Sequence, residues 1–556
     1  MSISPEYKKI LDRAIDAIHQ RTFFSQYPEH PSPKIYGENA DSEGQEKFKS
    51  HLNKPFSEID QQRAEKWFGE EESPYLQENL GIEYPFFETE TLIERANESF
   101  SAWRKASPED RANVLIDSLE RVKSRFFEIA YATMHTTGQG YMMAFQASGP
   151  HAADRALEAI AMGYYEQKRF PESTLWEKPM GKYNLTLRKS WKPIPKGISL
   201  VIGCSTFPTW NSVPGIYASL VTGNPVIVKP HPGAVLPIAI FISEITAAMK
   251  DAGYSVDTCQ LAVDSLKDPV TLALAEHSDI KLIDFTGNSE FGSTLERLTG
   301  KNVFTEKTGV NSIIVDSGND LDKIAQNIAF SITLYSGQMC TAPQNIFVPK
   351  DGINTPEGNV SFDEFVEKIT SNINGLVDNP KAGPFVLGAI QNQATCNRVE
   401  GVSKLHAKVV LESRTIENPM FKNARIATPA ILVTDAQNEE EFSKELFGPI
   451  AFIIKTNDTK ESVAIAKKLA IEHGAISCGA YTTDEEKKEF IAEEMSLAAT
   501  PVSFNLTGAI YVNQHATFSD FHVTGGNPAG NASFTNPEYV VRRFTWVGTR
   551  EPVSSN

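Results

Sequence analysis

Three side chains in this 556-residue sequence are of types that could work together in covalent catalysis. Cys340 lies between small residues in SGQMCTA, so its sulfur would be approachable as a nucleophile. Asn211, in FPTWNSVPG, follows the apolar run LVIG, where its amide could donate to a developing oxyanion. Glu306, in VFTEKTG, ends another apolar run, where a carboxylate can be tuned to act as a base on water. Each residue alone is more often structural, so their combination is what indicates catalysis.

A turn from Gly287 to Gly292 could hold a phosphate. The apolar run KLIDFT predicts a strand before it, and STLERL predicts the helix after it. The free N–H groups and the positive dipole end of such a helix favour a phosphate, although two glycines alone more often form only a tight turn. The sequence contains no P-loop and no GxSxG, HExxH or GxGxxG pattern.

Two series of short apolar runs predict the strands that must position these residues. Runs alternating with helical stretches are typical of βαβ units and a parallel sheet. We therefore expect an α/β protein with two tandem parallel-sheet domains. The first series covers 198–203, 225–230, 259–263, 281–287 and 310–317, and the second covers 344–349, 384–390, 407–413, 429–434, 449–455 and 476–482.

The two ends of the chain differ from this pattern. Residues 1–85 are rich in Glu, Gln, Ser and Pro and open with an amphipathic helical pattern, which predicts an appended, mainly helical extension. The segments KYNLTLRKSWKPI and YVVRRFTWVGTR alternate apolar and polar residues. These two strand-like segments could pair with each other or extend the sheet of a neighbouring subunit.

Composition excludes several classes of function. With 53 Lys and Arg against 70 Asp and Glu, the net charge of −17 disfavours nucleic-acid and membrane-surface binding. The five cysteines form no CxxC pair, which fits neither a disulfide framework nor a zinc site, so we expect no metal. The charged start MSISPEYKKILDRAI is unlike a signal peptide, and no apolar run reaches about 18 residues. A cytoplasmic location is therefore predicted.

Together these motifs resemble the aldehyde dehydrogenase superfamily, from about Glu88 to the C-terminus. The Trp-Asn pair matches the loop that supplies the family's oxyanion-hole asparagine, here Asn211. Glu306 falls where the family has its general base, and Cys340 where it has its nucleophile. Their separation, 340 − 306 = 34, agrees with the family.

The resemblance also implies a nicotinamide dinucleotide cofactor. TGNPVIVKP matches the strand that ends in the ribose-binding lysine, FTGNSEFG resembles the phosphate turn, and ELFGPI supplies residues that grip the nicotinamide ribose and ring. The residues predicted to bind the cofactor are Trp210, Lys229, His231, Thr286, Gly287, Gly292, Glu445 and Phe447.

We expect NADP to be preferred, with NAD possible. Three residues beyond Lys229, where NAD-preferring relatives often carry a glutamate for the adenosine ribose, the chain has Pro232. Without that carboxylate nothing repels a 2′-phosphate, and Lys229 with His231 could attract it.

The resemblance implies the domain organisation as well. Residues 1–85 would be the N-terminal extension, 86–307 an NAD(P)-binding domain with 181–195 as an oligomerisation hairpin, and 308–510 a catalytic domain. Residues 511–556 would return to the cofactor domain and end in an oligomerisation strand. A homodimer or a dimer of dimers is expected.

A closer resemblance covers nearly the whole chain and is to members of the superfamily that act in phenylacetic acid degradation. It rests on stretches such as HTTGQGYMMAFQASGPH, TEKTGVNSIIVDS and NQHATFSDFH. It implies oxidation of a ring-opened, CoA-linked semialdehyde to a carboxylic acid, through a thiohemiacetal and a thioester on Cys340. Alternatives are a CoA-acylating dehydrogenase and a catalytically silent scaffold. We assign no role to His515 or His522.

Overall fold

The first of two large sheets holds five parallel strands in the order β11-β10-β7-β8-β9. This computed structural model describes residues 3–59, 64, 66–511 and 517–553. On one side of the β7–β10 pair the chain continues to β8 and β9, and on the other side it continues to β11, so the strand order reverses between β7 and β10. Ligands of such sheets bind at the carboxyl ends of the strands beside that point. The strands are β7 (Ile198–Ile202), β8 (Val226–Lys229), β9 (Cys259–Leu261), β10 (Ile280–Thr286) and β11 (Asn302–Glu306).

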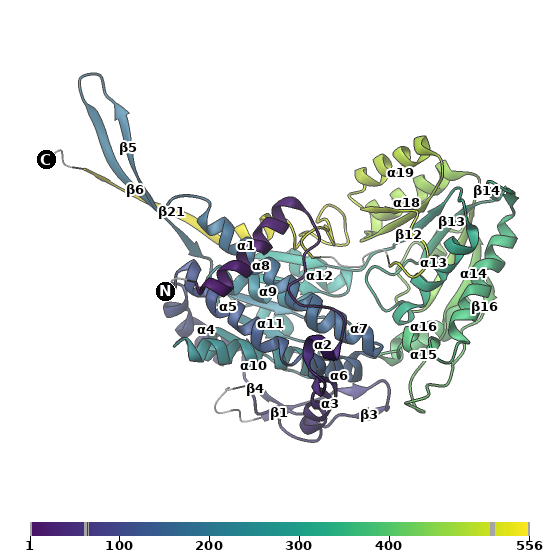
Figure 1. Ribbon diagram of the computed structural model, residues 1–556, viewed down its shortest axis with the longest axis horizontal. Coiled ribbons are helices and arrows are strands. Elements are labelled where there is room, and N and C mark those ends of the chain that lie inside the picture. Colours follow the sequence, from purple (N-terminus) through teal and green to yellow (C-terminus); the bar gives the residue numbers. More distant parts are fainter. Residues whose placement is uncertain (1–2, 60–63, 65, 512–516, 554–556) are drawn as a thin grey trace.

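Helices cover both faces of this sheet (Figure 1), so its strands are buried on both sides. The helices that contact the sheet include α4 (Thr89–Trp103), α9 (Pro208–Val221), α10 (Leu236–Asp251), α11 (Thr271–Glu276) and α12 (Ser289–Glu296). Helices α5 (Pro108–Lys123), α6 (Phe126–Thr137) and α8 (Ala152–Lys168) pack on α9 or α10.

The second sheet has seven strands in the order β16-β17-β18-β13-β12-β19-β20, parallel except for the β16–β17 pair. Two apolar clusters cover its faces. Its strands are β12 (Ser312–Val315), β13 (Asn345–Pro349), β16 (Lys408–Leu411), β17 (Ala430–Asp435), β18 (Ile450–Thr456), β19 (Cys478–Tyr481) and β20 (Val502–Phe504). Its main helices are α13 (Leu321–Thr333), α14 (Phe362–Val377), α18 (Thr459–His473) and α19 (Glu485–Leu497). The α/β class with parallel sheets is confirmed.

Two of the predicted runs need correction. Residues 310–317, placed in the first series, contain β12, which is an interior strand of the second sheet. Residues 384–390 do not form a strand, because Gly383–Leu387 is the short helix α15 with a proline in its first turn, a position that proline favours.

The N-terminal extension is helical at first, with α1 (Pro5–Gln20), α2 (Pro33–Tyr36) and α3 (Ala40–His51). Short strands follow, β1 (Lys66–Phe68), β2 (Glu72–Ser73), β3 (Glu78–Asn79) and β4 (Tyr84–Phe86). Helix α1 packs on α8 and α3 packs on α6. Leu11 and Phe56 belong to the same apolar cluster as Val228 of the first sheet, so the extension is part of that core.

The two strand-like segments pair with each other, which is one of the two predicted arrangements. Strands β5 (Ser173–Pro179), β6 (Asn184–Pro195) and β21 (Phe544–Pro552) form an antiparallel sheet in the order β21-β6-β5. Figure 1 shows this three-stranded arm projecting from the body of the molecule. Its root is fixed by the buried Arg543, whose guanidinium donates two hydrogen bonds to Asp284 of β10, at 2.6 and 2.7 Å.

Within the described residues no helix is long and apolar enough to cross a bilayer.

Candidate active site

The site lies where the carboxyl ends of the first sheet face the second sheet. Asn211 is in the first turn of α9, which begins with Pro208 directly after the loop that follows β7. Glu306 is the last residue of β11. The topology therefore brings both side chains to the point where the strand order reverses, and both are buried.

Cys340 is presented by a constrained turn after α13. Tyr335, Ser336 and Gly337 all have left-handed φ values, of 50°, 50° and 62°, a conformation that costs about 1–3 kcal/mol for each non-glycine residue. The Tyr335 hydroxyl donates to Thr137 O at 2.6 Å and the Ser336 hydroxyl to Leu387 O at 3.0 Å. These bonds hold the turn and so fix the position of the thiol.

Glu306 is the centre of a compact polar cluster. The Asn211 amide donates to Glu306 Oε2 at 3.0 Å, and His522 Nε2 lies 3.3 Å from Glu306 Oε1. His522 Nε2 is also 3.9 Å from Cys340 Sγ. The three predicted catalytic residues thus lie together, and a histidine joins them.

The electrostatics of the cluster determine which of its groups are protonated. Burial, and then the neighbouring Glu306 charge, raise the pKa of the Cys340 thiol well above its ordinary value. Burial alone would raise the pKa of Glu306, but His522 and Arg155 together hold it below the ordinary value. At neutral pH the resting site therefore contains a thiol and an ionised carboxylate, so Cys340 needs a base beside it to become a nucleophile.

Arg155, on helix α8, contributes part of the positive potential that lowers the pKa of Glu306. Its guanidinium carbon lies 3.6 Å from the centroid of the Trp210 ring, and its side chain is buried. Its Nε and Nη2 atoms have no hydrogen-bond partner among the described residues.

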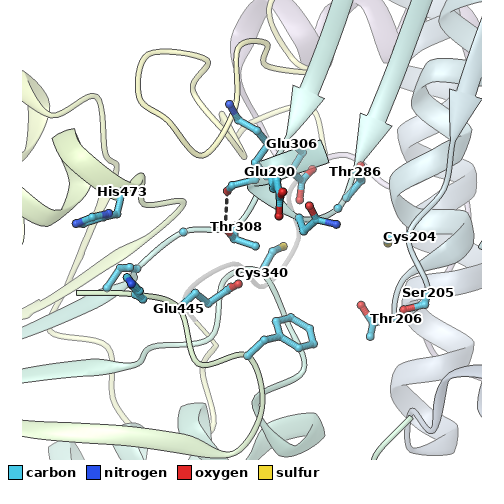
Figure 2. A pocket seen from close by; sticks show the side chains of 18 of the residues that line it. Cys204, Ser205, Thr206, Thr286, Glu290, Glu306, Thr308, Cys340, Glu445 and His473 are labelled. Carbon is cyan, nitrogen blue, oxygen red and sulfur yellow. Dashed lines mark hydrogen bonds between the residues drawn. The ribbon is translucent and has the colours of Figure 1, made fainter. Parts of the chain in front are cut away.

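Two cavities meet at Cys340. The larger, of about 800 Å³, runs from the turn at Thr286 and Gly287 to Glu445 and Phe447. Figure 2 shows Cys340 within it, with Cys204, Ser205 and Thr206 on the side of the first sheet and Glu445 and His473 on the side of the second. The smaller cavity, of about 370 Å³, is mainly apolar. Cys340 and Asn211 line both cavities.

The predicted cofactor residues fall into two groups. Thr286, Gly287, Glu445 and Phe447 line the larger cavity, and burial raises the pKa of Glu445 to about 8. Asn288 caps the N-terminus of α12 through its side chain, and this end of the helix lines the larger cavity. A Cβ at Gly292 would lie 2.7 Å from Lys307, so this glycine makes room for packing.

The other predicted cofactor residues lie elsewhere. Trp210 lines the smaller cavity and packs edge-on against His522. Lys229, at the end of β8, is buried and ion-paired with Asp264 at 2.6 Å. Burial, with the nearby Lys229 charge, lowers the pKa of His231 to about 4. His231 is therefore neutral at neutral pH in the unliganded site, and its contact with a 2′-phosphate stays a prediction.

Two residues of the cluster, His522 and Arg155, were not predicted as site residues from the sequence. His522 lies in a glycine-rich loop, where a histidine carries no pattern, although its stretch was part of the closer resemblance. Arg155 lies on helix α8 beside other buried charged residues, among them Asp154 and Glu158, and no local pattern in the sequence distinguishes it from them. His515 lies outside the described residues.

Comparisons with known proteins agree with this arrangement. The model of the "Aldehyde dehydrogenase family" matches residues 87–547. The crystal structure of an NAD-dependent aldehyde dehydrogenase from Burkholderia multivorans superposes with a TM-score of 0.97 at 43% identity, over 100% of both chains. Among curated proteins, a 1-pyrroline-5-carboxylate dehydrogenase of Halalkalibacterium halodurans is 25% identical over 78% of this chain and 81% of its own. An alpha-ketoglutaric semialdehyde dehydrogenase of Bacillus subtilis is 25% identical over 68% and 74%.

Proposed function

Because the chain belongs to the aldehyde dehydrogenase family, and so catalyses NAD(P)-dependent oxidation of an aldehyde, we propose that its substrate is an aldehyde with an uncharged, apolar chain next to the carbonyl. The product is the carboxylic acid, formed through a covalent intermediate on Cys340. The observation that carries the proposal is that Cys340 and Asn211 line both the larger cavity and the apolar one.

The larger cavity fits the cofactor. Its volume of about 800 Å³ and its helix start at Ser289 suit a dinucleotide with a pyrophosphate. Thr286 and Gly287 would face the phosphates, and Glu445 with Phe447 would face the nicotinamide end. Bound NAD(P) supplies the hydride acceptor.

The first chemical step is attack by sulfur. Glu306, with His522 beside it, takes the proton of the Cys340 thiol, and the thiolate adds to the aldehyde carbon to form a thiohemiacetal. The Asn211 amide and the Cys340 backbone N–H then donate to the new oxyanion. In the resting site one N–H of the Asn211 amide donates to Glu306, which leaves its second N–H for the oxyanion.

The second step releases the acid. Once the carbon has lost its hydride, a thioester remains on Cys340. Glu306 first passes the thiol proton to solvent through the larger cavity that it lines, and then removes a proton from water, so that hydroxide adds to the thioester carbon. The carbon–sulfur bond then breaks, which frees the carboxylic acid and returns the thiolate.

The lining of the smaller cavity supports the substrate class. Met142, Phe207 and Trp210 are among the apolar and aromatic residues that form it, and no lysine or arginine is among its described lining residues. His151 also lines it, but is paired with Glu29 at 2.6 Å. Burying a substrate carboxylate there without a cation would be costly, so the carboxylate-bearing substrates in the names of the relatives fit this cavity poorly.

The closer sequence resemblance supports a finer proposal, that the substrate is the ring-opened, CoA-linked semialdehyde of aerobic phenylacetate degradation. Its carbon chain is uncharged near the aldehyde and would occupy the apolar cavity, while the charged CoA part would stay outside.

A kinetic matrix tests both levels of the proposal. Purified protein is assayed with aliphatic and aromatic aldehydes, with semialdehydes of dicarboxylic acids, and with CoA-linked semialdehydes, each with NAD and with NADP. We expect uncharged or CoA-linked aldehydes to have the higher kcat/KM. Equal or better turnover of the free dicarboxylic semialdehydes would overturn the substrate class, and Cys340→Ala serves as the inactive control.

The same matrix tests the cofactor preference. The preference for NADP stays a prediction, and it now rests on the missing carboxylate at Pro232 alone, since Asp264 neutralises Lys229 and His231 is neutral. A higher kcat/KM with NAD than with NADP would contradict it. The cytoplasmic location also stays a prediction, and the five free cysteines support it.

A further inference from the structure

We propose that Cys340, His522 and Glu306 form a binding site for a soft divalent cation, with Zn²⁺ the best fit, and that its occupancy switches the enzyme off reversibly. The sequence predicts no metal, because its five cysteines form no CxxC pair, and the three proposed donors are far apart in the chain. The fold brings together one sulfur, one imidazole nitrogen and one carboxylate oxygen, all within 4.8 Å of one another.

The separations between the three donor atoms are close to those of a zinc site. Bond lengths of about 2.3 Å to sulfur and about 2.0–2.2 Å to nitrogen and oxygen place tetrahedral donors about 3.3–3.6 Å apart. His522 Nε2 is 3.3 Å from Glu306 Oε1 and 3.9 Å from Cys340 Sγ. A cation between them would require the His522–Cys340 pair to close by a few tenths of an ångström and the Cys340–Glu306 pair, which lies within 4.8 Å, to close by at most about 1.2 Å.

The donor types select the metal. Thiolate and imidazole suit Zn²⁺, whereas Mg²⁺ and Ca²⁺ require oxygen ligands. On binding, the Cys340 thiol releases its proton to solvent, so thiolate and carboxylate together balance the two positive charges. Arg155 opposes the cation by its charge, but its guanidinium is stacked on the Trp210 ring and does not occupy the site.

Neighbouring residues hold the donors in place. The Asn211 amide fixes Glu306 Oε2, and the Trp210 ring packs edge-on against His522 at 4.8 Å between centroids. The Asn311 amide donates to the Cys340 carbonyl at 2.7 Å. Such outer contacts raise metal affinity, and the two cavities leave a fourth position open to water.

Occupancy would stop the reaction at its first step. The metal would engage both the nucleophile Cys340 and the base Glu306, so no thiohemiacetal could form. Because the smaller cavity opens on the same sulfur, Zn²⁺ should compete with the aldehyde.

The test measures binding directly, without relying on turnover. The untagged full-length protein is freed of metal with a chelator, and its Zn²⁺ affinity is then measured by competition with a chromophoric chelator. We expect one equivalent to bind, and we expect Cys340→Ala and His522→Gln to weaken that binding by at least about tenfold. Co²⁺ in place of Zn²⁺ should give a thiolate-to-metal charge-transfer band that Cys340→Ala lacks.

A thiol elsewhere provides the matched control. Cys396→Ala should bind Zn²⁺ as the wild type does, because Cys396 is not among the three donors. In the wild-type protein, Zn²⁺ should also slow alkylation of Cys340 by iodoacetamide, measured by peptide mass spectrometry, while Mg²⁺ should not. Wild-type affinity in Cys340→Ala, or alkylation of Cys340 unaffected by Zn²⁺, would overturn the proposal even if the protein oxidises aldehydes as expected.

Discussion

In the proposed mechanism Glu306 has two tasks at different stages of the reaction, as the base for the Cys340 thiol and as the base for water. Both follow from its place at the end of β11, within reach of Asn211 and His522. His522 and Arg155 lower its pKa, so the carboxylate is ionised at neutral pH. The Asn211 amide donates one of its two N–H groups to Glu306, which leaves the other for an oxyanion.

The residue-scale prediction concerns Glu306→Gln. An amide there cannot take a proton from the Cys340 thiol or from water, so both chemical steps should slow. We expect turnover slower by about 10²–10⁴-fold, the usual contribution of a general base, with no burst of reduced cofactor. Rapid-mixing absorbance would show whether the first turnover is as slow as the later ones, and a burst of one equivalent would contradict the role of Glu306 as the base for the thiol.

A product assay separates hydrolysis from CoA acylation. If water is the natural acceptor, wild-type protein should form the free acid equally fast with and without coenzyme A. Formation of an acyl-CoA by wild-type protein would identify the acylating alternative.

At the scale of elements, the N-terminal helix supports the loop that carries His522. Arg21, the residue that ends α1, donates to Ser519 O at 2.9 Å and stacks on Phe521 at 4.1 Å. Phe24 contacts the buried Phe518, with 5.1 Å between ring centroids. The family model begins at residue 87, so these contacts come from outside it.

We therefore predict that Arg21→Ala lowers kcat through His522 while leaving the fold intact. Misplacing a catalytic group by about 1 Å costs up to about 10²-fold, and KM for the dinucleotide should not change because the larger cavity is remote from α1. Lys8→Ala on the same helix, where Lys8 pairs only with Asp12 at the surface, is the control. Equal steady-state kinetics in both variants would contradict this role for the extension.

Another element-scale prediction concerns the root of the arm. Arg543 is fully buried, and its bidentate pair with Asp284 ties the C-terminal segment to β10. Arg543→Met leaves the Asp284 carboxylate buried without its cation, which typically costs about 3–5 kcal/mol. The expected result is a clear drop in Tm by calorimetry, partly restored when Asp284→Asn is added. A single variant that melts with the wild type would refute the argument.

At the scale of the whole molecule, the arm presents two sheet edges, β5 and β21, to solvent. Leu175 on β5 and Val547 on β21 are 59% and 52% exposed. Unpaired strand edges with exposed apolar side chains are typical of surfaces that pair with another chain. Figure 1 shows the arm clear of the body, where it could reach a second subunit.

The prediction at this scale is that Leu175→Glu with Val547→Glu converts a dimer or larger oligomer into a monomer. Light scattering coupled to size exclusion gives the mass directly. Met420→Glu is the matched surface control. Met420 is 64% exposed and lies in the connection between β16 and β17 of the second sheet. A wild-type protein that is monomeric at micromolar concentration would refute the proposed homo-oligomer.

The sequence by itself predicted the α/β class and the residues Cys340, Glu306 and Asn211, and it left open whether the two strand-like segments pair with each other or with a neighbouring subunit. Each of these depends on local pattern, such as apolar runs, alternation or a residue set beside a strand end. The tertiary structure alone decided that His522 and Arg155 face Glu306, that Asp264 engages Lys229, and that the N-terminal helix contacts the His522 loop. These contacts join residues that are far apart in the chain, from 35 positions for Lys229 and Asp264 to 498 positions for Arg21 and Ser519. Folding alone sets the distances between such residues and the local dielectric, and these two quantities determine which groups are charged.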